Sequence, residues 1–206
     1  DIYSCTVEER EEFEGHLEKG VIVFSGIDYE LILQEAEREG DLIVWDGGNN
    51  DLPFYHPDLH ITVVDPLRPG HETDYYPGES NLKMADIIVI NKVNVADPSN
   101  VNYVLQSSQA ANPDAHIVQV RSEASLDRPD LVKGKRVLVV EDGPSLTHGG
   151  LKEGVGATVV RRLGGLLVDP REAAVGSIKS AYAEYPHLGP VLPALGYSKL
   201  QMEELE

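Results

Sequence analysis

Two apolar runs in the sequence end in polar residues of the kind that bind a nucleotide and its metal ion. Leu42–Asp46 places a carboxylate after four apolar residues, and Ile87–Asn91 leads into an Asn-Lys-Val-Asn run. At the carboxyl end of a buried strand, a carboxylate can hold Mg²⁺ while the ion bridges phosphate oxygens. The pattern predicts Asp46 as a metal ligand and three purine contacts, namely Asn91, Lys92 and Asn94. The alternatives are a turn aspartate, since Asp-Gly is common in turns, and an ordinary loop Asn-Lys pair.

The fourth residue of the second run bears on the choice of base. In GTP-binding proteins an Asn-Lys-x-Asp run closes a strand, and its aspartate accepts hydrogen bonds from guanine. Here that position is Asn94, whose amide oxygen accepts hydrogen bonds without the charge that strengthens them. The sequence therefore leaves both adenine and guanine open.

A second set of side chains carries positive charge or titrates near neutral pH. Arg68 offers a forked donor for phosphate or carboxylate, and His71 can act as an acid, a base or an oxyanion donor. His148 lies in a Ser- and Gly-rich stretch after an apolar run, where an expected helix start at Gly149 would present backbone N–H groups to an anion. The alternative for that stretch is an elaborate helix cap with a solvent-facing histidine.

Short apolar runs alternate with helical patterns, which is typical of βαβ units. We therefore expect an α/β fold with a mostly parallel sheet, helices on both faces and a carboxyl-terminal helical extension. The expected strands are Val21–Phe24, Leu42–Asp46, Ile61–Asp65, Ile87–Asn91, Ile117–Val120 and Arg136–Glu141. The expected helices follow Asp28, run over Pro98–Ala111 between Asp97 and Asn112, and cover Gly149–Leu163, Pro170–Tyr185 and Ser198–Glu206. The long connections 47–60 and 66–81 are expected to carry function.

Composition limits the classes of partner. The net charge of -18 at pH 7 argues against a nucleic-acid binder, which would show a basic face. No apolar run approaches the ~20 residues of a membrane helix, and no signal peptide is visible, so we expect no membrane partner and a cytoplasmic location. A small anionic ligand is still compatible, because local cations outweigh the global charge within about one Debye length.

Several motifs, taken together, resemble one family. They are Trp45–Asp51, the run from Val64 to Glu72, Tyr75–Glu79, Asn91–Val93 and the run from Glu141 to Gly150. The chain resembles the carboxyl-terminal half of proteins similar to cyclic 2,3-diphosphoglycerate synthetase, which are often labelled predicted GTPases. The resemblance implies a P-loop NTPase-like domain over residues 1–165 and an extension over 166–206. It also implies an amino-terminal part with a Gly-x-x-x-x-Gly-Lys-Ser/Thr loop ahead of residue 1, since the 206 residues contain none.

The resemblance implies an ATP- and Mg²⁺-dependent synthetase that joins the phosphates of 2,3-diphosphoglycerate into a cyclic anhydride. Asp46 would hold the metal, and Arg68, His71 and His148 would neutralise the anionic substrate. The expected partners are a small phosphorylated substrate, the amino-terminal part of the same protein and a second copy in a homodimer. This stretch alone is expected to be inactive. The alternatives are a GTPase of switch or metallochaperone type and a non-catalytic binding domain.

Overall fold

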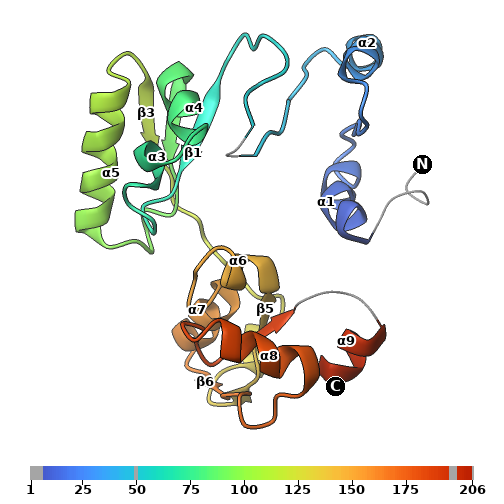
Figure 1. The fold of residues 1–206 in the computed structure, drawn as a ribbon, viewed down its shortest axis with the longest axis vertical. Coiled ribbons are helices and arrows are strands. Elements are labelled where there is room, and N and C mark those ends of the chain that lie inside the picture. Colours follow the sequence, from blue (N-terminus) through green and yellow to red (C-terminus); the bar gives the residue numbers. More distant parts are fainter. Residues whose placement is uncertain (1–6, 49–50, 195–198, 206) are drawn as a thin grey trace. The chain divides into compact units, whose positions relative to one another are not determined.

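The computed structural model describes residues 7–48, 51–194 and 199–205. The chain divides into two compact units, Asp1–Ser122 and Glu123–Glu206 (Figure 1). In the described ranges no helix is long and apolar enough to cross a membrane.

A three-stranded parallel sheet forms the centre of the first unit. Its strands are β1 (Ile61–Val64), β2 (Ile87–Ile90) and β3 (His116–Gln119), in the order β1-β2-β3. The register aligns Ile61 with Ile87 and Ile87 with His116. Three of the expected strands are therefore confirmed to within a residue or two, together with the α/β class.

The core of the first unit lies on one face of this sheet. It contains the buried residues Val64, Leu82, Ala85, Ile88, Ile90 and Val104. The helices α3 (His71–Asp74), α4 (Gly78–Met84) and α5 (Pro98–Ala111) pack against one another, and α5 packs on β2 (Figure 1). On the opposite face Ile61 and Val63 are 51% and 56% exposed, so the described residues cover that side of β1 only in part.

Helix α5 has the bounds that the sequence predicts, and its amino-terminal cap explains why. The carboxylate of Asp97 accepts a hydrogen bond from the backbone N–H of Ser99 at 2.8 Å, and Pro98 fills the first helical position. The Ser99 side chain and backbone N–H together hold the pKa of Asp97 below its usual value. The local sequence therefore sets this end of the helix.

Two expected strands, Val21–Phe24 and Leu42–Asp46, are not formed. They flank α2 (Tyr29–Glu39), which begins as predicted with the Asp28 carboxylate accepting from Leu31 N at 3.1 Å, and they follow α1 (Val7–Leu17). Leu42 and Val44 are 83% and 80% exposed. A strand needs a neighbouring strand to pair its backbone groups, and no described segment supplies one here. An apolar pattern alone was therefore not sufficient to predict a strand at either segment.

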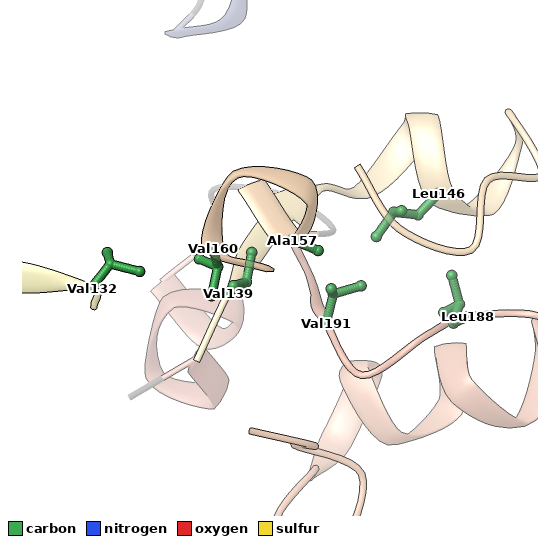
Figure 2. Close-up of a cluster of buried hydrophobic side chains, with 7 residues drawn as sticks. All are labelled: Val132, Val139, Leu146, Ala157, Val160, Leu188 and Val191. Carbon is green, nitrogen blue, oxygen red and sulfur yellow. The ribbon is translucent and has the colours of Figure 1, made fainter. Parts of the chain in front are cut away.

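The second unit is also built on parallel pairs of short strands. β4 (Arg136–Val137) pairs with β6 (Leu166–Leu167), and β5 (Val140–Asp142) pairs with β7 (Leu192–Ala194). A 3₁₀ turn covers Pro129–Leu131, and the helices are α6 (Gly143–Thr147), α7 (Val155–Arg162), α8 (Gly176–Glu184) and α9 (Lys199–Leu205). Figure 2 shows the buried cluster that these elements share, namely Val132, Val139, Leu146, Ala157, Val160, Leu188 and Val191. Because β6 and β7 pair with strands before residue 165, the segment after 165 is not the purely helical extension that the sequence indicates.

The helix expected over Gly149–Leu163 begins later, at Val155. Glu141 explains the difference, because its buried carboxylate accepts a hydrogen bond from Ala157 N at 2.9 Å in the first turn of α7. A Cβ on Gly154 would lie 2.2 Å from Glu141 Oε2, so this carboxylate fills the space beside the helix start. The first turn of α7 therefore has a carboxylate of the chain itself beside it, bonded to the N–H of Ala157.

Tyr182 gives the second unit a pH-dependent stability. Its hydroxyl donates to the carbonyl of Val191, and burial raises the pKa of Tyr182 to about 12. In the unfolded chain a tyrosine titrates near pH ~10. Between these two values the unfolded state loses its proton while the folded state keeps it, so stability falls as pH rises. Tyr182→Phe is expected to reduce this alkaline loss.

Urea unfolding at neutral and alkaline pH measures the effect. The exposed tyrosine Tyr103, at 53%, gives the matched control Tyr103→Phe. The unfolding midpoint of the control is expected to follow the parent protein into alkali, while that of Tyr182→Phe falls less. Equal alkaline losses in all three proteins would contradict the assignment.

Candidate functional site

The candidate site lies where the strands of the first unit end. In an open parallel sheet, ligands bind beyond the carboxyl ends of the strands. Here the loops that leave β1, β2 and β3 are tied together by backbone hydrogen bonds. Asn91 N donates to Val64 O at 3.0 Å, and Val93 N donates to Val120 O at 3.2 Å. These hydrogen bonds therefore fix the residues that follow the three strands relative to one another at the carboxyl end of the sheet.

An ion pair crosses this edge from one loop to the next. Lys92 Nζ lies 2.8 Å from Asp65 Oδ2, and the side chains are 35% and 25% exposed. The other carboxylate oxygen of Asp65 accepts from Leu67 N at 3.0 Å. The sequence predicts Lys92 but not its partner, because the two residues come from different strands.

Lys92 adopts a backbone conformation that is rare for a residue with a side chain. Its φ is 58°, in the left-handed region, and its N–H donates to Asn91 Oδ1 at 2.8 Å. Such a conformation costs on the order of 1–3 kcal/mol and is concentrated at functional sites. The surrounding structure therefore holds an ammonium group at the sheet edge at a cost to stability.

Arg68 lies in the loop between β1 and α3. Its side chain is half-buried, and its Nε is buried without a hydrogen-bond partner among the described residues. Most buried N–H groups in proteins have a partner, so an exception calls for an explanation. A guanidinium can bind phosphate or carboxylate through its N–H groups, so Arg68 is a candidate anion-binding residue, although its Nε is itself buried from solvent.

Glu72 holds the loop that carries Arg68 and His71, and sequence reasoning missed it. The residue is 8% exposed; its Oε2 accepts from Gly70 N at 2.9 Å, and its Oε1 accepts from the hydroxyl of Ser107 on α5. Gly70 has φ 95°, which favours glycine. The buried carboxylate of Glu72 therefore fixes this turn by bonding to both the loop and α5. In the sequence, only the position of Glu72 within the long loop pointed to a role for it.

His71 and Asn94 have different surroundings. His71 is the first residue of α3, is exposed, and meets the Tyr75 ring edge-on at a centroid distance of 4.8 Å. Asn94 forms a reciprocal pair with the Ser122 backbone, donating to its carbonyl at 3.0 Å and accepting from its N–H at 2.9 Å. These two hydrogen bonds fix the orientation of the amide, and each amide atom keeps the capacity for one further hydrogen bond.

Asp46 is exposed and follows an unpaired segment rather than a strand. Beside it, Trp45 meets Phe54 edge-on at 5.6 Å, and Phe54 stacks on Tyr29 at 4.3 Å. Asn49 and Asn50 of the same motif lie outside the described residues. Over the described ranges, no three His, Cys, Asp or Glu side chains come together as metal ligands. Mg²⁺ is commonly held by only one or two carboxylates together with substrate phosphates, so a single carboxylate can be sufficient. The role of Asp46 as a metal ligand therefore stays a prediction.

His148 belongs to the second unit, in the loop after α6. It is exposed, its Nδ1 lies 2.9 Å from the hydroxyl of Thr147, and its ring lies 6.2 Å from that of Tyr185. In the first unit, the structure brings Asn91 and Lys92 to one edge with Asp65, with Arg68 in the adjoining loop. This edge therefore carries a lysine ammonium group, paired with Asp65, and an arginine in the adjoining loop, which are groups of the kind that can bind an anion.

The chain is similar to two curated proteins that are named synthetases. Arginine synthetase ArcE of Thermococcus kodakarensis is 54% identical over 207 residues, which cover 100% of this chain and 46% of ArcE. Cyclic 2,3-diphosphoglycerate synthetase of Thermococcus sibiricus is 27% identical over 128 residues, which cover 61% of this chain and 29% of that protein. The chain thus spans less than half of the length of these relatives.

No protein-family model matches the chain, and no solved structure matches it. The expected resemblance to synthetases is confirmed at that coarser level. The sequence motifs indicated cyclic 2,3-diphosphoglycerate synthetase, whereas the similarity to ArcE is stronger and covers the whole chain.

Proposed function

We propose that the chain is part of a nucleotide-dependent synthetase that forms arginine. The observation that carries this proposal is the 54% identity to arginine synthetase ArcE over the whole chain. The geometry of the first unit supports it, because Lys92 and Arg68 place positive charge at a parallel-sheet edge, where a nucleotide phosphate would bind. Cyclisation of 2,3-diphosphoglycerate is the second candidate, favoured by the weaker similarity to the synthetase of that name.

In this proposal the cationic residues bind phosphate, and the histidine provides acid–base chemistry. Lys92 and Arg68 neutralise phosphate oxygens, while His71, exposed beside Tyr75, offers an acid or base at the same loop. Asn91 shapes the turn that presents Lys92, because its side chain accepts from the Lys92 N–H. ATP is the proposed nucleotide, with GTP as the competitor, and Asp46 is the proposed ligand of Mg²⁺.

The proposal also extends to partners and location. We propose that the residues that complete the nucleotide site come from an amino-terminal part of the same protein; the chain covers only 46% and 29% of its two relatives, so the relatives have further residues outside the match. A homodimer and a cytoplasmic location are part of the same proposal.

Ligand-induced thermal stabilisation of the full-length protein tests the substrate assignment. A ligand at about 100 times its dissociation constant stabilises the folded state by ~2.7 kcal/mol, which raises the melting temperature measurably. With Mg²⁺ and ATP present, arginine is expected to raise the melting temperature further. Lysine is the matched control ligand, because it carries the same charge without a guanidinium group.

The outcomes separate the candidates. Stabilisation by 2,3-diphosphoglycerate but not by arginine would transfer the assignment to the second candidate. A larger shift with GTP than with ATP would favour the GTPase reading. No response to either nucleotide would contradict the synthetase proposal itself.

A further inference from the structure

Asp74 differs from the other carboxylates between β1 and the first turn of α4. Asp65 pairs with Lys92, Glu72 accepts from Gly70 N and the hydroxyl of Ser107, and Glu79 Oε1 lies 2.6 Å from Lys83 Nζ. The Asp74 side chain is exposed, and within the described ranges it forms no hydrogen bond or ion pair. Its charge is therefore available to a ligand.

The turn that carries Asp74 is fixed by its own hydrogen bonds. The backbone N–H groups of Thr73 and Asp74 donate to Gly70 O at 3.1 and 3.0 Å. A Cβ on Gly70 would lie 3.2 Å from Asp74 Oδ2, so the carboxylate lies over the turn. The buried carboxylate of Glu72 ties the same turn to α5. Asp74 is thus held on a preorganised support, which lowers the entropy cost of binding.

Two exposed aromatic rings follow Asp74 directly. Tyr75 is 57% exposed and Tyr76 is 77% exposed. The Tyr75 ring meets that of His71 edge-on at a centroid distance of 4.8 Å, which limits its movement. The face of an aromatic ring attracts a cation, and a guanidinium both stacks on such a face and donates to a carboxylate. Residues 74–76 therefore offer the two kinds of group that a guanidinium needs.

We propose that Asp74 and Tyr75 bind the guanidinium group of arginine. This inference deepens the proposed function and rests on it, because arginine is the product there. The carboxylate accepts from the guanidinium N–H groups, and the ring of Tyr75 stacks on the guanidinium plane. Arg68 lies in the same loop, so this loop serves the phosphate at one end and the amino acid at the other.

Isothermal titration of the full-length protein with arginine, in the presence of Mg²⁺ and ATP, tests the proposal. Asp74→Asn is expected to weaken arginine binding about tenfold, the effect of a hydrogen bond to a charged group. Tyr75→Leu is expected to weaken it about threefold, the effect of one exposed cation–π contact. The matched controls are Asp114→Asn, an exposed carboxylate ahead of β3, and Tyr103→Leu, an exposed ring on α5. Both should bind arginine as the parent protein does.

Citrulline separates recognition of charge from damage to the fold. It has the shape of arginine, with a neutral ureido group in place of the guanidinium. Asp74→Asn should therefore weaken citrulline binding at most about twofold, so the preference for arginine over citrulline falls about fivefold or more. A variant that merely disturbs the loop would weaken both ligands equally. The rise in melting temperature caused by ATP should be the same in Asp74→Asn as in the parent.

The outcomes distinguish this inference from the function on which it rests. If Asp74→Asn bound arginine as tightly as the parent, or lost arginine and citrulline equally, the proposal would be overturned and the arginine assignment would stand. If Tyr75→Leu lost affinity for ATP and not for arginine, the ring would belong to the base, which also overturns it. If the parent protein bound no arginine, the arginine assignment itself would fail, and this inference with it.

Discussion

A Lys92→Gly variant of the full-length protein is expected to lose about 100-fold in nucleotide-dependent turnover, the usual effect of removing one group that stabilises charge in a transition state. Lys92 brings an ammonium group to the edge where β1 and β2 end, beside Asp65 at 2.8 Å. Glycine adopts the same backbone turn, so the substitution removes the ammonium group and leaves the path of the loop unchanged. Steady-state phosphate release measures the loss.

The same variant is expected to keep its stability. Lys92 has φ 58°, a conformation that glycine adopts without strain, so the substitution relieves on the order of 1 kcal/mol. It also removes a partly exposed ion pair, which contributes roughly 0.2–1 kcal/mol. The two effects offset each other, so the free energy of unfolding stays within about 1 kcal/mol of the parent protein.

Lys92→Asn provides the matched control, because asparagine tolerates the left-handed region and carries no charge. It should lose as much activity as Lys92→Gly, whereas Lys92→Arg, which keeps the charge, should retain more. If activity in all three variants followed their stability instead of their charge, the role of Lys92 would be structural.

Asn112→Ala is expected to lower the free energy of unfolding of the first unit by about 3–5 kcal/mol, since each buried polar group left without a partner costs roughly 1–3 kcal/mol. The Asn112 side chain is buried and donates from Nδ2 to the carbonyls of Leu82, Lys83 and Ala85. These are the last carbonyls of α4 and its cap, which have no partner within the helix. Asn112 Oδ1 also accepts from Ala115 N at 3.2 Å.

Urea unfolding monitored by circular dichroism measures this loss. Asn112→Asp should be no better than Asn112→Ala, because a carboxylate keeps the acceptor for Ala115 N but turns negative charge toward three carbonyls. Asn102, which is exposed on the same helix, supplies the control Asn102→Ala, with an expected change within ~0.5 kcal/mol. A loss at Asn112 no larger than at Asn102 would contradict this account of how the end of α5 is joined to the end of α4.

The elements that the sequence predicts well are those whose signals are local. Helix α5 has a cap at Asp97, a proline at its first position and a stop at Asn112, so its bounds follow from neighbouring residues. Strands β1, β2 and β3 are apolar runs that find each other as partners. Leu42–Asp46 has the same pattern but lacks a pairing strand among the described residues, so a local signal was not enough.

The parts of the site that escaped prediction depend on contacts between distant residues. Asp65 meets Lys92 across 27 positions, and Glu72 meets Ser107 across 35. Neither contact has a spacing that sequence patterns reveal. The strands β6 and β7 were missed for another reason, because they have two and three residues and are too short to show a period.

The most direct test of the central claim is the melting temperature of the full-length protein with and without Mg²⁺ and ATP, measured for the parent and for Lys92→Gly. If the carboxyl edge of β1 and β2 binds the nucleotide phosphates, ATP raises the melting temperature of the parent. The shift is then much smaller in the variant, whose own stability is unchanged. An equal shift in both proteins would place the nucleotide elsewhere and contradict the account.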